Sequence, residues 1–129
     1  MLLVNLALHL TLGYVVFSAI VIRPSTGAVE GSRRPELFVA DRQTNMVLVL
    51  DPFTGAPLRT VGSGRGNGSG QMRNPIGLAL RECLVTKQHD ESLQPMGVVY
   101  VSDKTNHRIQ VYNADTGEFV MTIGRGEGP

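Results

Sequence analysis

The chain contains an internal repeat, and this repeat constrains the fold more than any other feature of the sequence. The segment from Val98 to Gly126 aligns without a gap on the segment from Glu36 to Gly64, 62 positions upstream. Eight of the 27 pairs from Phe38/Tyr100 to Gly64/Gly126 are identical. The identical pairs are Val39/Val101, Asp41/Asp103, Val49/Val111, Thr54/Thr116, Gly55/Gly117, Thr60/Thr122, Gly62/Gly124 and Gly64/Gly126. A period in this range indicates a stacked or radial repeat architecture.

Each repeat is predicted to consist of short strands joined by tight turns. Fifteen glycines and seven prolines lie in short clusters, and helical periodicity is weak after residue 22, so the chain is predicted to be all-β. Asp41 and its counterpart Asp103 each follow an apolar run, where a carboxylate can accept hydrogen bonds from backbone amides just ahead. Gly55 and Gly117 are expected in hairpin turns at a positive φ.

Residues 1–22 form an apolar stretch with no acidic or basic side chain apart from His9, and the stretch is long enough to span a bilayer. Small residues near a cut site favour a cleaved signal peptide, although no positive region precedes the apolar run. Arginines that follow it favour an uncleaved anchor with the remainder of the chain in the cytoplasm. Two further interpretations are a buried strand over VVFSAIVI and a wrongly assigned translation start. A genuine leader or anchor would make the protein secreted or membrane-associated.

Three polar segments separate the expected strands. Residues 23–35 are interpreted as a linker, in which PSTGAV weakly echoes PIGLAL and would supply a first strand. Residues 65–73 are interpreted as a flexible glycine-rich connector, because no phosphate-binding loop motif fits them. Residues 81–96 lack strand alternation and are interpreted as an insertion that projects from the scaffold.

The insertion supplies the candidate binding loop. This loop comprises Lys87, His89, Asp90 and Glu91. The last three are adjacent rather than spaced for one face, which favours a solvated loop tip over a metal site. Asn67 begins the one N-x-[ST] sequon and is a candidate glycosylation site if the loop is luminal.

Composition narrows the partner classes. A formal charge of +1 and an aromatic content of 5% give no basic, aromatic surface, so nucleic acid is not an expected partner. The single cysteine, Cys83, excludes an internal disulfide and any cysteine-based zinc site.

The second repeat resembles a known family. QMRNPIGLAL at 71–80, VYVSD at 99–103 and NHRIQVY at 106–112 occur in the order of the NHL repeat. Asn106, His107 and Arg108 lie where that family has its name-giving triplet, whereas the first repeat has Thr44-Asn45-Met46 there and is degenerate. Residues 36–64 are thus interpreted as the first repeat and residues 74–126 as the second.

The resemblance implies a six-bladed β-propeller built from four-stranded antiparallel blades. The sequence accounts for about two blades, so we expect a partial propeller that is either a fragment or a module completed by self-association. The resemblance also implies structural roles for the residues that define the repeat. These are Asp41, Gly55, Gly62, Pro75, Gly77, Asp103, Asn106, His107, Arg108, Gly117 and Gly124.

Three functions follow as hypotheses. The first is a non-catalytic scaffold that binds a protein or another macromolecule through its loops and needs no cofactor. The second is a fragment of a metal-dependent lyase or lactonase-like enzyme, which would hold Ca or Zn in a central channel, although no catalytic or metal-binding residue is identified in this chain. The third is a membrane-anchored or secreted propeller ectodomain.

Overall fold

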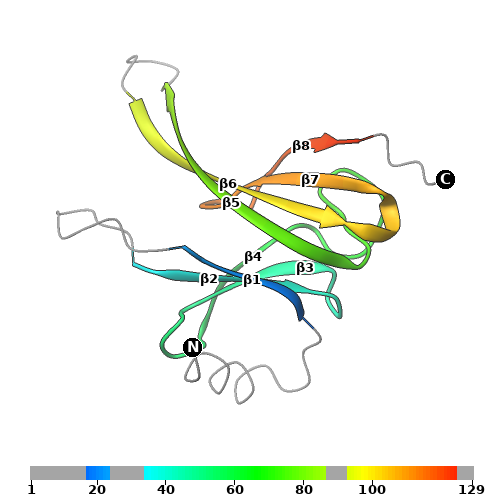
Figure 1. Cartoon of the computed structure of the whole chain (residues 1–129), viewed down its shortest axis with the longest axis horizontal. Coiled ribbons are helices and arrows are strands. Elements are labelled where there is room, and N and C mark those ends of the chain that lie inside the picture. The colour runs from blue at the N-terminus through cyan, green and yellow to red at the C-terminus, as the bar shows by residue number, and fades with distance from the viewer. Residues whose placement is uncertain (1–16, 24–33, 87–92, 125–129) are drawn as a thin grey trace.

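The computed structural model consists of two four-stranded antiparallel sheets that pack face to face (Figure 1). It describes residues 17–23, 34–86 and 93–124. The strand order is β1-β2-β3-β4 in the first sheet and β5-β6-β7-β8 in the second. The chain therefore contains two all-β units of the kind expected for partial propeller blades.

Each sheet is formed by strands that follow one another along the chain. The first sheet consists of β1 (Phe17–Arg23), β2 (Glu36–Asp41), β3 (Met46–Leu50) and β4 (Pro57–Val61). The second consists of β5 (Pro75–Thr86), β6 (Leu93–Asp103), β7 (Arg108–Asn113) and β8 (Phe119–Ile123), with the 3-10 turn η1 (Lys104–Asn106) between β6 and β7. Pro57 begins an edge strand, where the absence of an N–H leaves no ladder bond unmade.

The sequence repeat corresponds to a repeat of strands. The 62-residue offset places β2, β3 and β4 on the last part of β6, on β7 and on β8. The first strands are related by a different offset, because Val39 pairs with Ile20 and its counterpart Val101 pairs with Leu78. β1 and β5 are therefore equivalent in space although their alignment in sequence is shifted.

The first strand of the first sheet lies upstream of the predicted position. PSTGAV, which was expected to supply it, falls outside the described residues, and β1 is formed by Phe17–Arg23. Of the interpretations for residues 1–22, a strand describes residues 17–22, because this β-branched run pairs antiparallel with β2. Residues 1–16 lie outside the described part, so cleavage, anchoring and the start site stay untested. Among the described residues, no helix is both long and apolar enough to cross a membrane.

The prediction that residues 81–96 form an irregular insertion between two strands is wrong for the described residues. β5 continues to Thr86 and β6 begins at Leu93, with the register Glu82↔Gly97 to Thr86↔Leu93. Figure 1 shows the resulting β5–β6 hairpin extending away from the sheets. Backbone pairing needs no alternation of apolar and polar side chains, so the lack of alternation over residues 81–96 gave no strand signal.

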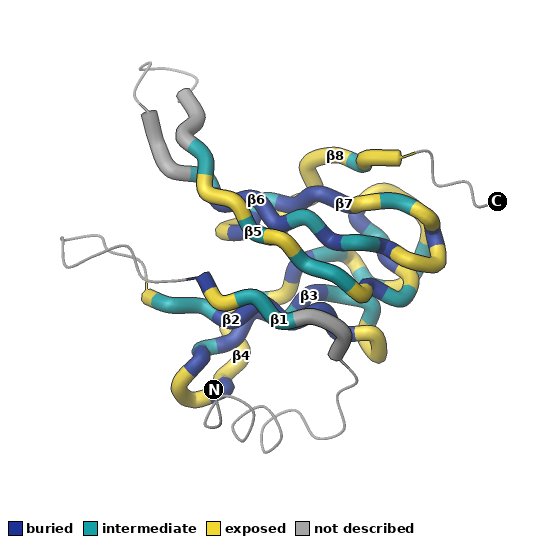
Figure 2. Tube along the Cα trace, viewed as in Figure 1, coloured by how far each residue is buried: buried dark blue, intermediate teal, exposed yellow. Residues whose placement is uncertain are grey.

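An apolar core joins the two sheets. The first sheet contributes Phe38, Val47, Val49 and Val61, and the second contributes Val99, Val101 and Tyr112; all seven are buried. Val21, Leu78 and Leu80 pack at the margin of this core. Figure 2 shows the buried positions concentrated where the sheets face each other. Each fully buried aliphatic or aromatic side chain stabilises the fold by about 1.5–3 kcal/mol, so this interface is a major source of stability.

Two of the identical glycine pairs occupy positive φ angles in both repeats. Gly55 and Gly117 have φ values of 72° and 78° in the β3–β4 and β7–β8 turns, and Gly62 and Gly124 have 97° and 100° after β4 and β8. A side chain with a Cβ rarely adopts these angles. The same backbone requirement therefore accounts for glycine at these four positions.

Replacing the core aromatic side chain tests the packing between the sheets. Phe38→Ala removes a fully buried ring that also lies 5.7 Å from the Arg59 guanidinium carbon, so the free energy of unfolding should fall by about 3–5 kcal/mol. The matched control is Phe53→Ala, whose ring is 79% exposed and whose loss should cost less than about 0.5 kcal/mol. Urea denaturation followed by circular dichroism measures both, and equal losses would contradict the described core.

Candidate functional site

The repeat signature of the second sheet is centred on a buried carboxylate. Asp103 ends β6 and is fully buried. Its Oδ1 accepts a hydrogen bond from the backbone N–H of Arg73 at 2.7 Å. Its Oδ2 accepts bonds from Asn106 Nδ2 at 2.7 Å and Arg108 Nε at 2.9 Å. These three donors, of which Arg108 is cationic, satisfy a carboxylate whose burial would otherwise be costly.

Arg108 and Asn106 extend this centre to the glycine-rich connector. Arg108 Nη1 donates to the carbonyl of Asn67, and Nη2 donates to those of Gly68 and Gln71, each at 2.9 Å. Asn106 Nδ2 donates to the carbonyl of Gly66 at 2.9 Å. The planar guanidinium presents several N–H groups in fixed directions, which suits a cluster of carbonyl oxygens on one loop.

The prediction that residues 65–73 form a flexible connector is therefore wrong. Besides the bonds from Asn106 and Arg108, the Tyr112 hydroxyl donates to the carbonyl of Gly70 at 2.9 Å. Burial is the main cause that raises the pKa of Tyr112, and the nearby Asp103 carboxylate adds to it. The hydroxyl therefore stays protonated as a donor. Side chains of the following sheet bind the connector carbonyls, a long-range effect that glycine content does not reveal.

The first repeat lacks this arrangement. Asp41 accepts hydrogen bonds from the backbone N–H groups of Gln43 at 2.9 Å and Thr44 at 3.3 Å, which closes its own turn. Thr44 and Met46 stand where the second repeat has Asn106 and Arg108. The first repeat thus keeps the turn that the aspartate forms and has neither side chain that binds the connector.

His107 adopts the left-handed backbone conformation that ends the η1 turn. It follows η1 at φ 52°, and its counterpart Asn45 has φ 57°. The His107 N–H donates to the carbonyl of Lys104 at 3.2 Å. Asn tolerates this left-handed conformation better than most residues, and the second repeat places a histidine in the same conformation.

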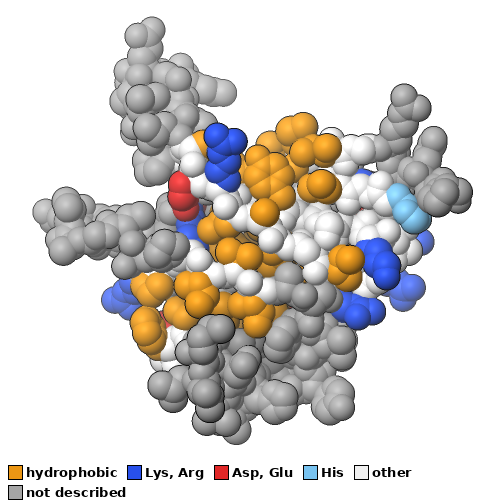
Figure 3. Space-filling model, in the orientation of Figure 1, with side chains coloured by type: hydrophobic (Ala, Val, Ile, Leu, Met, Phe, Trp, Pro, Cys, Tyr) orange, Lys and Arg blue, Asp and Glu red, His pale blue; other side chains and the backbone are white. Residues whose placement is uncertain are grey.

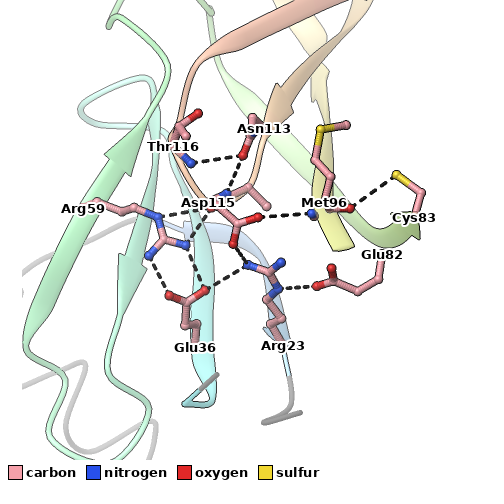
Figure 4. Close-up of polar contacts among 11 residues, drawn as sticks. Arg23, Glu36, Arg59, Glu82, Cys83, Met96, Asn113, Asp115 and Thr116 are labelled. Atoms are coloured by element: carbon pink, nitrogen blue, oxygen red, sulfur yellow. Dashed lines mark hydrogen bonds and ion pairs between the residues drawn. The ribbon is translucent and has the colours of Figure 1, made fainter. Parts of the chain in front are cut away.

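A second polar cluster lies at the base of the β5–β6 hairpin (Figure 4). Arg23 at the end of β1 is 1% exposed and binds three carboxylates. They are Glu82, Asp115 at 2.8 Å and Glu36 at 3.3 Å. Arg59 on β4 forms a bidentate pair with Glu36 at 2.6 and 2.8 Å, and its Nη2 donates to the carbonyl of Ala114 at 2.6 Å.

This cluster connects the two sheets through charge. The first sheet contributes Arg23, Glu36 and Arg59 to this cluster. The second contributes Glu82 on β5 and Asp115 in the turn between β7 and β8. A Cβ at Gly97 would clash with Arg23 Nη2, so any larger residue at this position would require the Arg23 side chain to move. Burial opposes ionisation of Glu36, but its bonds to Arg59 and then Arg23 outweigh it and lower the Glu36 pKa. The sequence gave no signal for this cluster, because its members are single charges scattered over five segments.

The other predicted residues take the following positions. Pro75 begins β5, and Gly77 follows the bulge between Pro75 and Gly77. Asn67 is exposed in the connector. The candidate binding loop, with Lys87, His89, Asp90 and Glu91, lies outside the described residues. Cys83 lies on β5, where its Sγ donates to the carbonyl of Met96 at 3.3 Å.

The described part of the chain contains no group of three His, Cys, Asp or Glu side chains placed so that they could hold a metal ion. The Ca or Zn ligands that the enzyme alternative requires therefore stay a prediction.

Replacing Arg108 tests whether its bonds to the connector carbonyls stabilise the fold. Arg108→Lys keeps the charge but removes the fork that reaches three carbonyls, so we expect a loss of about 1–3 kcal/mol of stability. Backbone amides of residues 66–71 should also exchange with solvent faster. Arg65→Lys, at an exposed connector position, is the control and should change neither quantity. If these amides exchanged at the same rate in Arg108→Lys as in the wild type, Arg108 would not be holding the connector.

The Glu36 pair gives a pH prediction. The folded-state pKa of Glu36 lies below its ordinary value of 4.5, so the pair stabilises the protein above that value and the stabilisation is lost as pH falls through the folded pKa. Glu36→Gln should cost roughly 1–3 kcal/mol at neutral pH and much less at about pH 3. Urea denaturation at both pH values measures this, with the exposed Glu118→Gln as control. A constant difference between Glu36→Gln and the wild type would contradict the account.

Comparison with known families agrees with this geometry. The NHL repeat model matches residues 92–112, which include all of β6, the η1 turn and β7 as far as Tyr112. No curated protein and no solved structure shows a significant match to the chain. The second sheet, in which Asp103, Asn106 and Arg108 bind the connector, is therefore built around an NHL repeat.

Proposed function

We propose that the chain is a non-catalytic interaction scaffold of the propeller type, and that the extended β5–β6 hairpin is its main binding element for a protein partner. NHL repeats commonly serve as such scaffolds, and the family match supports this class of function. The length of the hairpin is the observation that supports the choice of this element as the binding site. The hairpin continues for five residue pairs beyond Arg81↔Val98, the last pair at which β7 also contributes a partner.

The geometry of the hairpin supports a binding role. β5 is an edge strand of its sheet, and from Met96 to Leu93 the described part of β6 pairs with β5 alone, whereas Gly97 also bonds to Ala114 and Asp115. Such strands leave backbone N–H and C=O groups available to an added strand. The candidate binding loop, residues 87–91, follows in the sequence between the two arms. The charge cluster holds the base of the hairpin, which would fix its direction relative to both sheets.

The polar residues of the repeat support a scaffold rather than a reaction site. Asp103, Asn106 and Arg108 bind one another and the connector carbonyls. Their chemistry is directed inward, where it stabilises the blade. Affinity would then come from loops and from the hairpin, as in other proteins with a rigid scaffold and variable connections.

A shortened hairpin tests the proposal. Glu82 and Gly97 are a register pair, so residues 83–96 can be replaced by Asn-Gly, which favours a two-residue hairpin turn. This variant keeps Glu82 and Gly97 in the charge cluster. Proteins crosslinked to the full-length chain in its source cells would be purified and titrated by calorimetry against both forms.

The expected result is a partner that binds the full-length chain and loses at least about tenfold in affinity for the shortened variant. The thermal unfolding of the variant should remain cooperative, which separates lost binding from lost folding. Arg65→Lys is again the control for a change outside the hairpin. Equal affinity of the two forms would reject the hairpin as the binding element.

A further inference from the structure

The face of the second sheet that is turned away from the first sheet is largely apolar, with Arg81 at its margin on the hairpin side and Val111 at 2% exposure. We call it the outer face; its side chains are Ala79, Tyr100, Ile109, Val111, Met121 and Ile123, which occupy two paired rows across the strands. Ile109, Met121 and Ile123 are 37%, 49% and 42% exposed. Figure 3 shows hydrophobic side chains gathered over this sheet. Contiguous apolar surface of this kind marks an interaction site.

The internal repeat shows what kind of surface the outer face fits. Four of its members, Tyr100, Ile109, Val111 and Ile123, are the counterparts of Phe38, Val47, Val49 and Val61. In the first sheet these four positions are fully buried against another β-sheet. The same positions in the second sheet thus carry side chains suited to an apolar sheet face.

A second copy of the chain can supply that sheet only through its own outer face. A head-to-tail arrangement would require the opposite face of the first sheet, which carries Leu37, Val39 and Leu50. These three side chains are already buried, at 1%, 0% and 0% exposure. Ile22, which is paired with Leu37 on that face, is 49% exposed, whereas the outer face exposes Ile109, Met121 and Ile123. A contact between copies that buries the most apolar surface therefore uses the outer face twice.

The shape of the outer face is complementary to itself. Small residues on β5, Gly77 and Ala79, line a shallow groove of about 240 Å³ with Tyr100, Ser102 and Ile109. At the other edge of the sheet, Met121 and Ile123 on β8 project into solvent. A two-fold axis near β6 and β7 would place β8 of each copy over the β5 groove of the other.

We propose that two copies of this chain associate through their outer faces into a two-fold symmetric dimer. The contact is isologous, which is the commonest symmetry of soluble dimers. The sheets then pack about 10 Å apart, as in a β-sandwich. Because the six side chains carry no charge, no ion is buried without a partner, and the association is driven by apolar burial.

The mass of the chain in solution tests the proposal first. Light scattering after size exclusion should give about twice the chain mass of 13.9 kDa. Met121→Lys places a charge in the contact and should raise the dimer Kd about tenfold or more. The control Leu58→Lys changes an apolar residue on β4 that is 50% exposed and should leave the dimer unchanged. Like the wild type, this variant retains residues 1–22. A monomeric wild type, or loss of the dimer in Leu58→Lys, would overturn the proposal.

Cysteine crosslinking identifies the faces in contact. In a Cys83→Ser background, a mixture of Ala79→Cys and Met121→Cys chains should form a crosslinked dimer under mild oxidation. Neither chain should do so alone. Ala79 and Met121 lie on the two edge strands of one sheet, about three strand spacings of 4.8 Å apart, so both cysteines in one chain are beyond the roughly 7 Å reach of a disulfide. A dimer that forms without this crosslink would overturn the isologous geometry.

Discussion

The apolar contact between the two sheets is the interaction on which every other feature of this chain depends. A four-stranded sheet has two faces and cannot bury either of them by itself, so each repeat needs a neighbour. Phe38 and Val49 on one side and Val99 and Tyr112 on the other exclude water from both sheets at once. The hairpin and the connector gain fixed positions because they are attached to sheets that are held together in this way.

Polar contacts at the two ends of β7 set the relative position of the sheets. At its beginning, Arg108 binds the connector that leads from the first sheet to the second. Just beyond its end, Ala114 and Asp115 meet Arg59 and Arg23 of the first sheet. Apolar packing alone is nondirectional, so these directional bonds at both ends define one register. The contacts of Arg23 and Arg59 and those of Arg108 thus both fix the relative position of the sheets, although these residues are far apart in the sequence.

The sequence predicted the parts of the fold that rest on local chemistry and repetition. Asp41 and the paired glycines marked turns correctly, because one residue type meets one backbone requirement. Asp103 also precedes a turn, but its carboxylate binds Arg73, Asn106 and Arg108 instead of the backbone amides just ahead, which were its expected partners. The sequence left β1 open between VVFSAIVI and PSTGAV, since an apolar run in residues 1–22 resembles a leader as much as a strand. The long hairpin and the ordered connector were missed because backbone pairing and the reach of Arg108 leave no periodic trace. The Arg23 cluster was unpredictable for the same reason, as its partners come from distant segments.

Native-state hydrogen exchange tests most directly whether the two sheets form one cooperative unit. Amides would be followed in the central strands β3 and β7 at several denaturant concentrations, and their opening free energies compared. The account predicts that the slowest amides of both strands open with the same free energy, equal to that of global unfolding. A markedly lower value for β3 than for β7 would show that the first sheet opens independently, and it would contradict the packing described between the sheets.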